Sequence, residues 1–595
     1  MVRGTESDLT PGIVAVMYYP TMASLIKKIK KGKVYWYAVE CRRINGKPRI
    51  AWQKYLGRAD DIVKATQRAT APQPESVRIR QFGSIAALLS AAEPLDVVAV
   101  INRHVPKRRQ GPSIGEYMLL AAINRACDPK SKLQIGEWYE QTILPRLWKH
   151  PAAAFTSQRF WDAMDAVSEE SIAAIERDLV DRLMQTTKLD LRAILYDTTN
   201  FATFIHTLND RNTVARRGHA KNKRHDLRLV GLALVVTRTF GIPLMHETYA
   251  GNVNDSTQFG SLVLQLAERY RQLAKTCEDL TLVFDKGNNS GDNFTLLGLE
   301  QVHFVASLVA SQHRDLLEIP LEQYQPLQGD EWAGVRAYRC QREIFGQMRT
   351  VVVTFTESFF SQQAQALLAT MAKCVGKLDD LAKRLRAWHS PRKGQRKPAG
   401  RPPGHSAVEQ QVNAILSAQH MRHLIQVEIS DTKAGVPKLN FTSDQDGLHR
   451  LIERICGKTI LFTDREAWTN EEIVSAYRAQ SDIESRFRDM NDWDFLRWSP
   501  MYHWTDQKIR VHAFYCVLAL MLVGVLRQRL AEAGIDLPPH ALLDTLSKML
   551  ETVVIYPPAH PPAPPRLATT LSRFDAHQKA IYKALDLAQW RSSGG

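Results

Sequence analysis

Five short apolar segments between residues 191 and 308 restrict what this chain of 595 residues can fold into. They are the runs 191–201, 227–238, 242–251, 280–291 and 302–308. Each is rich in Val, Ile and Leu and is bounded by turn residues, a pattern that predicts buried strands. A helical pattern at 255–275 separates the third run from the fourth. The chain therefore predicts an α/β core with three strands, a helix and two more strands in chain order.

Two of these strands lead into aspartates. Asp197 lies near the end of the first run, and the strand in the fourth run ends at Asp285. Ligands of α/β sheets bind at the carboxyl ends of strands, so both positions suit chemistry. Aspartates at strand ends also form turns and helix caps, and that interpretation stays open for each residue taken alone.

A third carboxylate lies in the helical segment YRAQSDIESRFRDMND, residues 477–492. Ile483, Phe487 and Met490 give this helix an apolar face, and Glu484 lies beside that face. A plainer interpretation pairs Glu484 with Arg488, four residues further on.

The strand and helix order is that of a ribonuclease-H-like core, where two strand-end aspartates and a helix glutamate can converge on one phosphate. Carboxylate oxygens are the ligands that Mg²⁺ prefers, and phosphoryl transfer with two metal ions needs several of them. Asp197, Asp285 and Glu484 meet that need, so two Mg²⁺ ions are the expected cofactor, with Mn²⁺ as a substitute. One ion would activate water or a DNA 3′-hydroxyl, and the other would stabilise the leaving oxygen. The sequence has no GxxxxGK phosphate loop, so no nucleotide cofactor is expected.

The charge of the chain indicates a polyanionic partner. Lys and Arg number 78 against 62 Asp and Glu, a formal net charge of +16, which favours double-stranded DNA as the partner. The stretch RRGHAKNKRHDLR at 216–228 leads into the second strand, close to the proposed metal centre. A solvated loop is the alternative to a DNA contact there. The candidate DNA-binding residues in it are Arg216, Arg217, Lys221, Lys223 and Arg224.

Composition and periodicity divide the chain into six segments. A β-hairpin around Asn45-Gly46 is expected within residues 1–75, followed by a helical, DNA-binding domain at 76–188. The core is expected in two parts, 189–309 and 456–530, and a C-terminal helical region at 531–595. Between the two core parts, residues 310–455 predict an insertion domain that contains the basic, proline-rich stretch 389–406.

The cysteines and the apolar segments bear on the cell compartment. Seven cysteines lie far apart, without a CxxC pair or zinc-ligand spacing, which is typical of a reduced, cytosolic chain. The N-terminal residues lack the pattern of a secretion signal. The longest apolar stretch, 513–526, is too short to span a bilayer and predicts a core helix. We therefore expect a cytoplasmic protein, associated with the nucleoid when bound to DNA, and no membrane partner.

Three acidic motifs resemble those of the DDE transposases of bacterial insertion sequences. They are YDTTNF, VFDKGNNS, and YRAQSDIESRFRDM followed by PMYHWTDQKIRVHAF. The likeness is to the IS-four-like superfamily, in particular its group numbered sixteen-thirty-four, and it covers roughly residues 191–526 and the N-terminal hairpin. Asp285 follows Asp197 by 88 residues, and Glu484 follows Asp285 by 199, a gap that resembles the family's mostly β insertion domain. The resemblance implies that these three carboxylates are the catalytic metal ligands.

The glutamate helix departs from the superfamily pattern at two places. In the wider superfamily a tyrosine is followed by an arginine three residues on, the glutamate four after that, and a lysine seven further. The corresponding residues here are Tyr477, Gln480, Glu484 and Asn491, so the arginine and the lysine are replaced. These spacings place all four on one helix face, which we expect to meet the DNA end through uncharged hydrogen bonds at the two replaced positions.

Two further groups of residues near the glutamate helix, three arginines and four tryptophans, each have two possible interpretations. Arg478, Arg486 and Arg488 can supply the missing cations, although a solvent-facing role is expected for at least two of them. Trp468, Trp493, Trp498 and Trp504 are expected to pack in the core, with base stacking as the alternative.

The resemblance implies DNA transposition. Such a protein binds the terminal inverted repeats, cleaves to release a 3′-hydroxyl and joins that hydroxyl to target DNA. Two DNA ends joined by one machine imply at least a homodimer in the synaptic complex. Two alternatives stay open: a metal-dependent nuclease on the same core, and a DNA-binding protein with an inactive triad, which the missing arginine and lysine favour.

Overall fold

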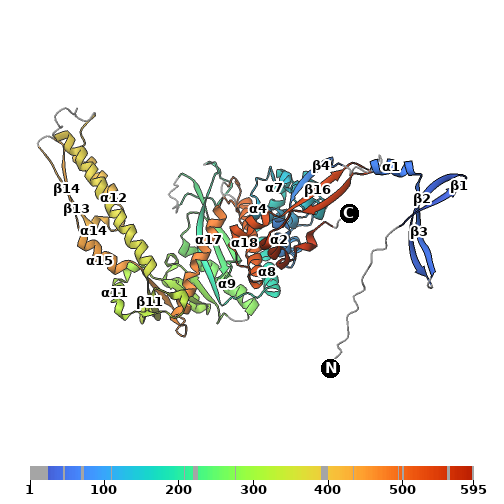
Figure 1. Cartoon of the computed structure of the whole chain (residues 1–595). Coiled ribbons are helices and arrows are strands. Elements are labelled where there is room, and N and C mark those ends of the chain that lie inside the picture. The colour runs from blue at the N-terminus through green and yellow to red at the C-terminus, as the bar shows by residue number, and fades with distance from the viewer. Residues whose placement is uncertain are drawn as a thin grey trace, which may run out of the picture. The chain divides into compact units, whose positions relative to one another are not determined.

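The computed structural model in Figure 1 describes residues 24–44, 47–68, 73–108, 110–206, 208–218, 226–274, 277–389, 400–432, 435–492, 495–498, 501–558 and 563–592. The chain forms two compact units. The first consists of Met1–Ile79, Thr552–Leu571 and Ser592–Gly595, and the second of Arg80–Glu551 and Ser572–Arg591.

The first unit begins with an antiparallel sheet of β1 (Ser24–Lys30), β2 (Lys33–Ile44) and β3 (Lys47–Gly57), followed by α1 (Ala59–Arg68). Ile44 pairs with Lys47, which leaves two residues for the predicted hairpin turn; Asn45 and Gly46 themselves lie outside the described residues. β1 adds a strand that the sequence did not indicate. Lys31 and Gly32, between β1 and β2, both have positive φ, as a two-residue hairpin turn requires.

A second small sheet has the order β17-β16-β4 and consists of β4 (Ser76–Gln81), β16 (Leu550–Tyr556) and β17 (Arg566–Leu571). It corrects the expectation of a helical region at 531–595, because α19 (Pro539–Ser547) and α20 (Ala576–Ala584) are separated by these two strands. β16 has the sequence LETVVIY, whose β-branched residues favour an extended strand.

Residues 83–186 are mostly helical, as predicted, whereas the start of the predicted helical domain at 76–188 forms the strand β4. The helices are α2 (Gly83–Ala92), α3 (Val97–Arg103), α4 (Ile114–Cys127), α5 (Ile135–Glu140), α6 (Leu144–Trp148), α7 (Ser157–Asp165) and α8 (Glu169–Thr186). α4 starts with a capping box, in which Ser113 and Glu116 each accept from the other's backbone N–H. This helical layer contacts the long helix α18 (Asp506–Glu532) through α2, α4 and α7.

α18 is longer than the apolar stretch that predicted it. By length and composition it could cross a membrane, yet 94% of its most apolar window is buried inside the protein. It also packs on β7, so it joins the helical layer to the central sheet. This is the position expected of a core helix.

The central sheet has the order β10-β11-β12-β15-β9-β8-β5-β6-β7. β5 (Ala193–Thr203), β6 (Arg228–Thr237) and β7 (Pro243–Ala250) are antiparallel neighbours, and β8 (Thr281–Phe284) and β9 (His303–Ser307) continue from β5 in parallel. Helix α9 (Asp255–Ala274) connects β7 with β8, and α10 (Gly291–Leu299) connects β8 with β9. These five strands have the predicted positions, and their arrangement is consistent with a ribonuclease-H-like core.

The sheet continues past β9 with strands from the segment predicted to be an insertion domain. β15 (Lys458–Thr463) pairs with β9, then come β12 (Gln347–Thr356), β11 (Val335–Ile344) and the short β10 (Gln325–Pro326). β11 and β12 lie within the predicted insertion domain, but these strands extend the central sheet and do not form a separate module. Their buried apolar side chains, such as Val351 and Val353, require a covered sheet interior.

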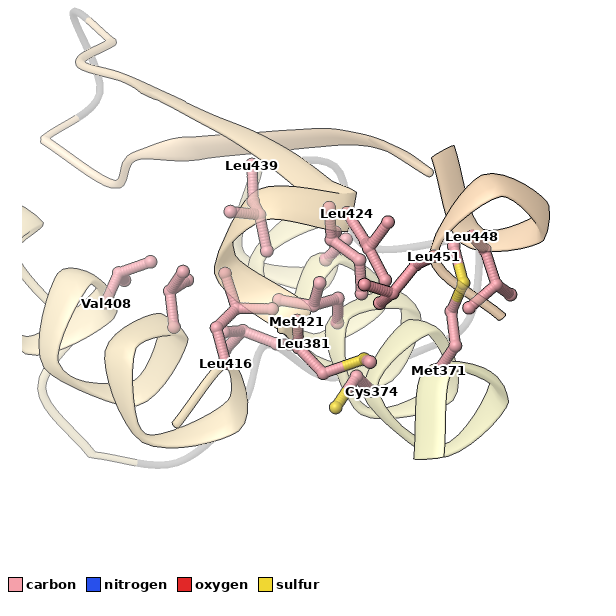
Figure 2. Close-up of a cluster of buried hydrophobic side chains, with 14 of the residues drawn as sticks. Met371, Cys374, Leu381, Val408, Leu416, Met421, Leu424, Leu439, Leu448 and Leu451 are labelled. Atoms are coloured by element: carbon pink, nitrogen blue, oxygen red, sulfur yellow. The ribbon is translucent and has the colours of Figure 1, made fainter. Parts of the chain in front are cut away.

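The chain leaves the sheet after β12 and returns at β15, and what lies between is mostly helical. The expectation of a mostly β insertion is wrong, because the longest element is α12 (Glu357–His389) and only β13 (Ile425–Ser430) and β14 (Lys438–Ser443) form a small sheet of their own. The other helices are α13 (His405–Ile415), α14 (Met421–Leu424) and α15 (Gln445–Ile455). Figure 2 shows the apolar core of this part, where Leu381, Met421 and Leu424 lie among side chains from α12 to α15.

The close packing of α3 against α4 can be tested by a substitution at Gly115. A Cβ atom at this position would lie 2.4 Å from the carbonyl oxygen of Val98, a backbone atom that cannot turn away. We expect Gly115→Ala to lower the free energy of unfolding by about 1–3 kcal/mol, measured by urea unfolding. In α10 no described atom lies within 4 Å of a Cβ added at Gly298, so Gly298→Ala should raise stability by up to about 1 kcal/mol. Equal shifts in the two variants would contradict the close approach.

Candidate active site

Asp197 and Asp285 lie at the same level of two neighbouring parallel strands. Leu195 of β5 pairs with Val283 of β8, and each aspartate follows its paired residue by two positions. Neighbouring strands are about 4.8 Å apart, so the register brings together two carboxylates that are distant in sequence. Asp285 follows the last residue of β8, as predicted, whereas β5 continues past Asp197 to Thr203, paired with β6.

Two hydroxyl groups hold the carboxylate of Asp285. The hydroxyl of Ser307, the last residue of β9, donates to Oδ1 over 2.9 Å, and the phenol of Tyr477 donates to the same oxygen over 3.2 Å. The side-chain amide of Asn289 donates to the carbonyl oxygen of Ser307 over 2.9 Å. The ends of β8 and β9 and the tyrosine of the glutamate segment therefore form one hydrogen-bonded cluster.

The predicted glutamate helix is two helices. α16 (Asn470–Arg478) begins with a capping box of Thr469 and Glu472, and α17 (Gln480–Asn491) follows after the single residue Ala479. Tyr477 is thus on a different helix from Glu484, which corrects the expectation of four residues on one uninterrupted helix face. The break lies just where Tyr477 reaches Asp285 of β8 and Gln480 reaches β5.

Gln480 fixes α17 to the strand that carries Asp197. Its Nε2 donates over 2.9 Å to the carbonyl oxygen of Tyr196, the residue before Asp197, and the side chain is only 6% exposed. Little of the surface of this side chain therefore remains for the DNA contact predicted at position 480. Glu484 is one helical turn further along the same face of α17 and is exposed.

The pKa of Tyr477 reports the local electrostatics. Burial raises this pKa, and the negative charges of Asp285 and Glu484 raise it further, while the hydrogen bond with Ser307 lowers it. The phenol contacts Asp285 directly, whereas Glu484 acts on it through its charge. Asp197 lies on the strand that neighbours the one leading into Asp285.

The other predicted DNA-binding residues have varied positions. Arg216 and Arg217 are exposed at the edge of β6, where Arg216 forms an isolated bridge with Leu229. Arg488 and Asn491 are exposed on α17. Lys221, Lys223 and Arg224 lie outside the described residues.

The arginines considered as substitutes for the missing cations differ in burial. Arg486 is buried and pairs with Asp489 over 3.0 Å. Arg478 is exposed and lies over the ring of Trp332, and Arg488, also exposed, donates to Ser485.

Three carboxylates and no thiolate or imidazole form a donor set suited to a hard divalent cation such as Mg²⁺. Within the described part of the chain, however, no three His, Cys, Asp or Glu side chains are gathered closely enough to hold a metal ion as they stand. The chemistry of the donors fits Mg²⁺, and the strand register accounts for two of them.

Sequence reasoning missed Ser307 and Asn289. Ser307 lies near the end of the fifth predicted strand, at the same sheet edge as Asp285, and that position was the available signal. Asn289 is part of the VFDKGNNS motif, but nothing in its spacing indicated a bond to the next strand.

Comparison with known proteins identifies the family. Residues 189–522, more than half of the chain, match the family described as "Transposase DDE domain". The chain therefore belongs to the DDE transposase family, which confirms the class that its acidic motifs indicated.

Two solved structures show distant likeness. A cryo-EM structure of the piggyBac transposase synaptic complex with hairpin DNA is 7% identical, covers 80% of this chain and 82% of that chain, and has a TM-score of 0.35. The Mos1 transposase paired-end complex with left transposon end is 12% identical. The match covers 36% of this chain and 63% of that chain, with a TM-score of 0.15. Likeness at this level carries no argument about this chain. Among curated proteins, none matches the sequence.

The electrostatic link between Tyr477 and Glu484 can be measured. Because the glutamate charge disfavours the phenolate, we expect Glu484→Gln to lower the pKa of residue 477. A fluorinated tyrosine placed at 477 brings the titration into an accessible range, and its ¹⁹F shift follows ionisation. Asp292→Asn, which removes an acid from the first turn of α10, is the control. An unchanged pKa in Glu484→Gln would show that Glu484 is remote from the phenol.

Proposed function

We propose that this protein is a DNA transposase that binds the terminal inverted repeats of an insertion sequence, cleaves the ends and joins the 3′-hydroxyl to target DNA. Within its family we assign it to the IS-four-like superfamily, group sixteen-thirty-four. The observation that carries the proposal is the alignment of Asp197 and Asp285 on adjacent parallel strands, next to a tyrosine that also senses Glu484.

In this proposal the chain's own residues position and orient the reacting groups. Asp197, Asp285 and Glu484 would hold two Mg²⁺ ions, with Mn²⁺ as a substitute. When bound, such ions activate the attacking oxygen and stabilise the leaving oxygen of an in-line displacement. The hydroxyls of Ser307 and Tyr477 occupy Oδ1 of Asp285, which fixes the orientation of the carboxylate. Gln480 keeps α17, and with it Glu484, against β5.

The alternatives are a nuclease that cuts without joining and an inactive DNA-binding relative. The second rests on the loss of the superfamily arginine at position 480. The hydrogen bond from Gln480 to β5 gives that residue a structural use here, which favours an intact site over a decayed one.

The proposed partner is double-stranded DNA, both at the transposon ends and at the target, with a homodimer in the synaptic complex. The excess of 78 basic over 62 acidic residues supports a polyanionic partner. We also propose a cytoplasmic location near the nucleoid, in keeping with seven cysteines that are all free thiols.

The catalytic assignment is tested with a labelled DNA end from the source element, Mg²⁺ or Mn²⁺, and separate assays for binding, cleavage and joining. We expect Asp197→Asn, Asp285→Asn and Glu484→Gln each to bind DNA and to lose roughly 1,000-fold or more in cleavage, since a charge clamp is worth several kcal/mol. Asp482→Asn, on an exposed part of the same helix, should keep activity near the wild-type level.

The outcomes separate the three functions. Cleavage without joining by the wild type would favour the nuclease, and binding without cleavage would favour the inactive relative. Normal activity of Glu484→Gln would remove that residue from the site.

The exposed arginines at the edge of β6 give a second prediction. We expect the double variant Arg216→Gln, Arg217→Gln to weaken DNA binding and to reduce the slope of log K against log salt by about 1–2, one for each phosphate that an arginine neutralises in the wild type. Lys548→Gln is the control, because Lys548 pairs with Asp544 of α19. An unchanged salt slope would show that the two arginines bind no phosphate.

A further inference from the structure

A cavity of about 850 Å³ lies where α4, α7 and α18 meet the segment that follows the glutamate helix, entirely within Arg80–Glu551. Its volume is in the range of small-molecule sites. Basic residues are frequent in its lining, where five of them accompany one carboxylate, Asp165. These are Arg125, Lys130, Lys132, Arg497 and Lys508. Asp165 is itself engaged by Lys508, and Lys130 by Asp128.

Lys132 is the least expected of these residues. Its side chain is only 8% exposed, and its ammonium group has no hydrogen-bond partner in the part of the chain that the structure describes. The group lies 4.3 Å from the ring centre of Tyr515 and 5.1 Å from that of Phe160. Burial lowers the pKa of the Lys132 amine well below its usual range, and its nitrogen has donors but no acceptor, so a bound anion would supply the missing partner and stabilise the protonated form.

Two histidines, His503 and His512, also line the cavity. Burial lowers the pKa of His503 to about 3, with the charges of Lys132 and Arg125 acting in the same direction. His512, whose Nε2 also has no partner among the described atoms, has a lowered pKa for the same reasons. Arg125 is held in place by its hydrogen bond to the carbonyl oxygen of Arg497 over 3.0 Å.

Exposed aromatic side chains also line the cavity. Trp504 is 47% exposed, and Tyr502 and Trp161 are exposed as well. The guanidinium of Arg211 lies 5.1 Å from the ring centre of Trp504, a contact that steadies the ring. Exposed aromatic faces next to buried cations are the combination that stacks a base and binds its phosphate.

We propose that this cavity binds one nucleotide, with its phosphate against Lys132 and Arg125 and its base against Trp504. The nucleotide is either an unpaired unit of a DNA strand or a free mononucleotide, which share this chemistry. The DNA source rests on the proposed function and on the connection to β5, since Thr203 forms a bridge with Met501 in the cavity lining. Thr203 is six positions beyond Asp197 on β5, roughly 20 Å away, so one DNA molecule can reach both places.

The test uses the full chain in EDTA and two fluorescent probes, 2-aminopurine deoxynucleoside monophosphate and a single-stranded heptamer with 2-aminopurine at its centre. Stacking quenches the probe. We expect Lys132→Met to weaken binding of both probes by roughly 10- to 100-fold, since a hydrogen bond to a charged group is removed. Lys132→Arg, which keeps the charge, should retain most of the affinity. Trp504→Ala should weaken binding by roughly 5- to 100-fold, and Trp504→Tyr should restore much of it.

Lys188→Met is the matched control, because Lys188 is an exposed lysine outside the cavity lining. Tighter binding of the heptamer than of the monophosphate would identify a DNA strand as the source, and equal binding would identify a free nucleotide. The proposal is overturned if Lys132→Met, with an unchanged melting temperature, binds like Lys188→Met. It is equally overturned if inorganic phosphate displaces the probes as effectively as dAMP does. Because no cleavage is measured, this result does not depend on whether the chain transposes DNA.

Discussion

The parallel pairing of β5 with β8 is the constraint on which the candidate active site depends. Asp197 and Asp285 become neighbours only because Ala193, Ile194 and Leu195 pair with Thr281, Leu282 and Val283. A shift of one residue in this register would turn one of the two aspartates to the opposite face of the sheet. The pairing is protected by burial, since all six residues are at most 5% exposed. Parallel neighbours also need a long crossover, which β6, β7 and α9 provide.

Uncharged hydrogen bonds attach the helices around Glu484, the third carboxylate, to the paired strands β5 and β8. Tyr477 reaches Asp285 and Gln480 reaches the backbone beside Asp197, so α16 and α17 are each tied to one aspartate-bearing segment. The short break at Ala479 lets both contacts form. Position 480 is buried here, and a buried guanidinium without a partner would be costly. The Nε2 of Gln480 donates to β5, while its Oε1 has no hydrogen-bond partner among the described atoms, so one hydrogen bond is what this residue contributes in place of the superfamily arginine.

Much of the core could be predicted from local pattern. The strands at 191–201, 227–238 and 242–251 and the helix at 255–275 were visible because each has one clear periodicity and defined ends. Asp197 and Asp285 were predicted from their positions at strand ends, and Glu484 from its position on an amphipathic helix. Sequence could not show that β11 and β12 join the central sheet, because pairing partners depend on distant segments. Nor could it show the buried Lys132, since periodicity reports apolar faces and not where a single cation lies.

The sheet tolerates the long insertion because its two ends lie side by side. The chain leaves from β12 into α12 and returns through α15 into β15, and Phe355 pairs directly with Lys458. The ends of the excursion are thus fixed by the same antiparallel pairing that holds the sheet together. The inserted part buries its own apolar cluster, including Leu378, Val408 and Met421, and so does not need the core to cover its hydrophobic side chains. Loop-closure entropy grows only slowly with length, so roughly a hundred residues can be added there at small cost to the strand register that aligns the carboxylates.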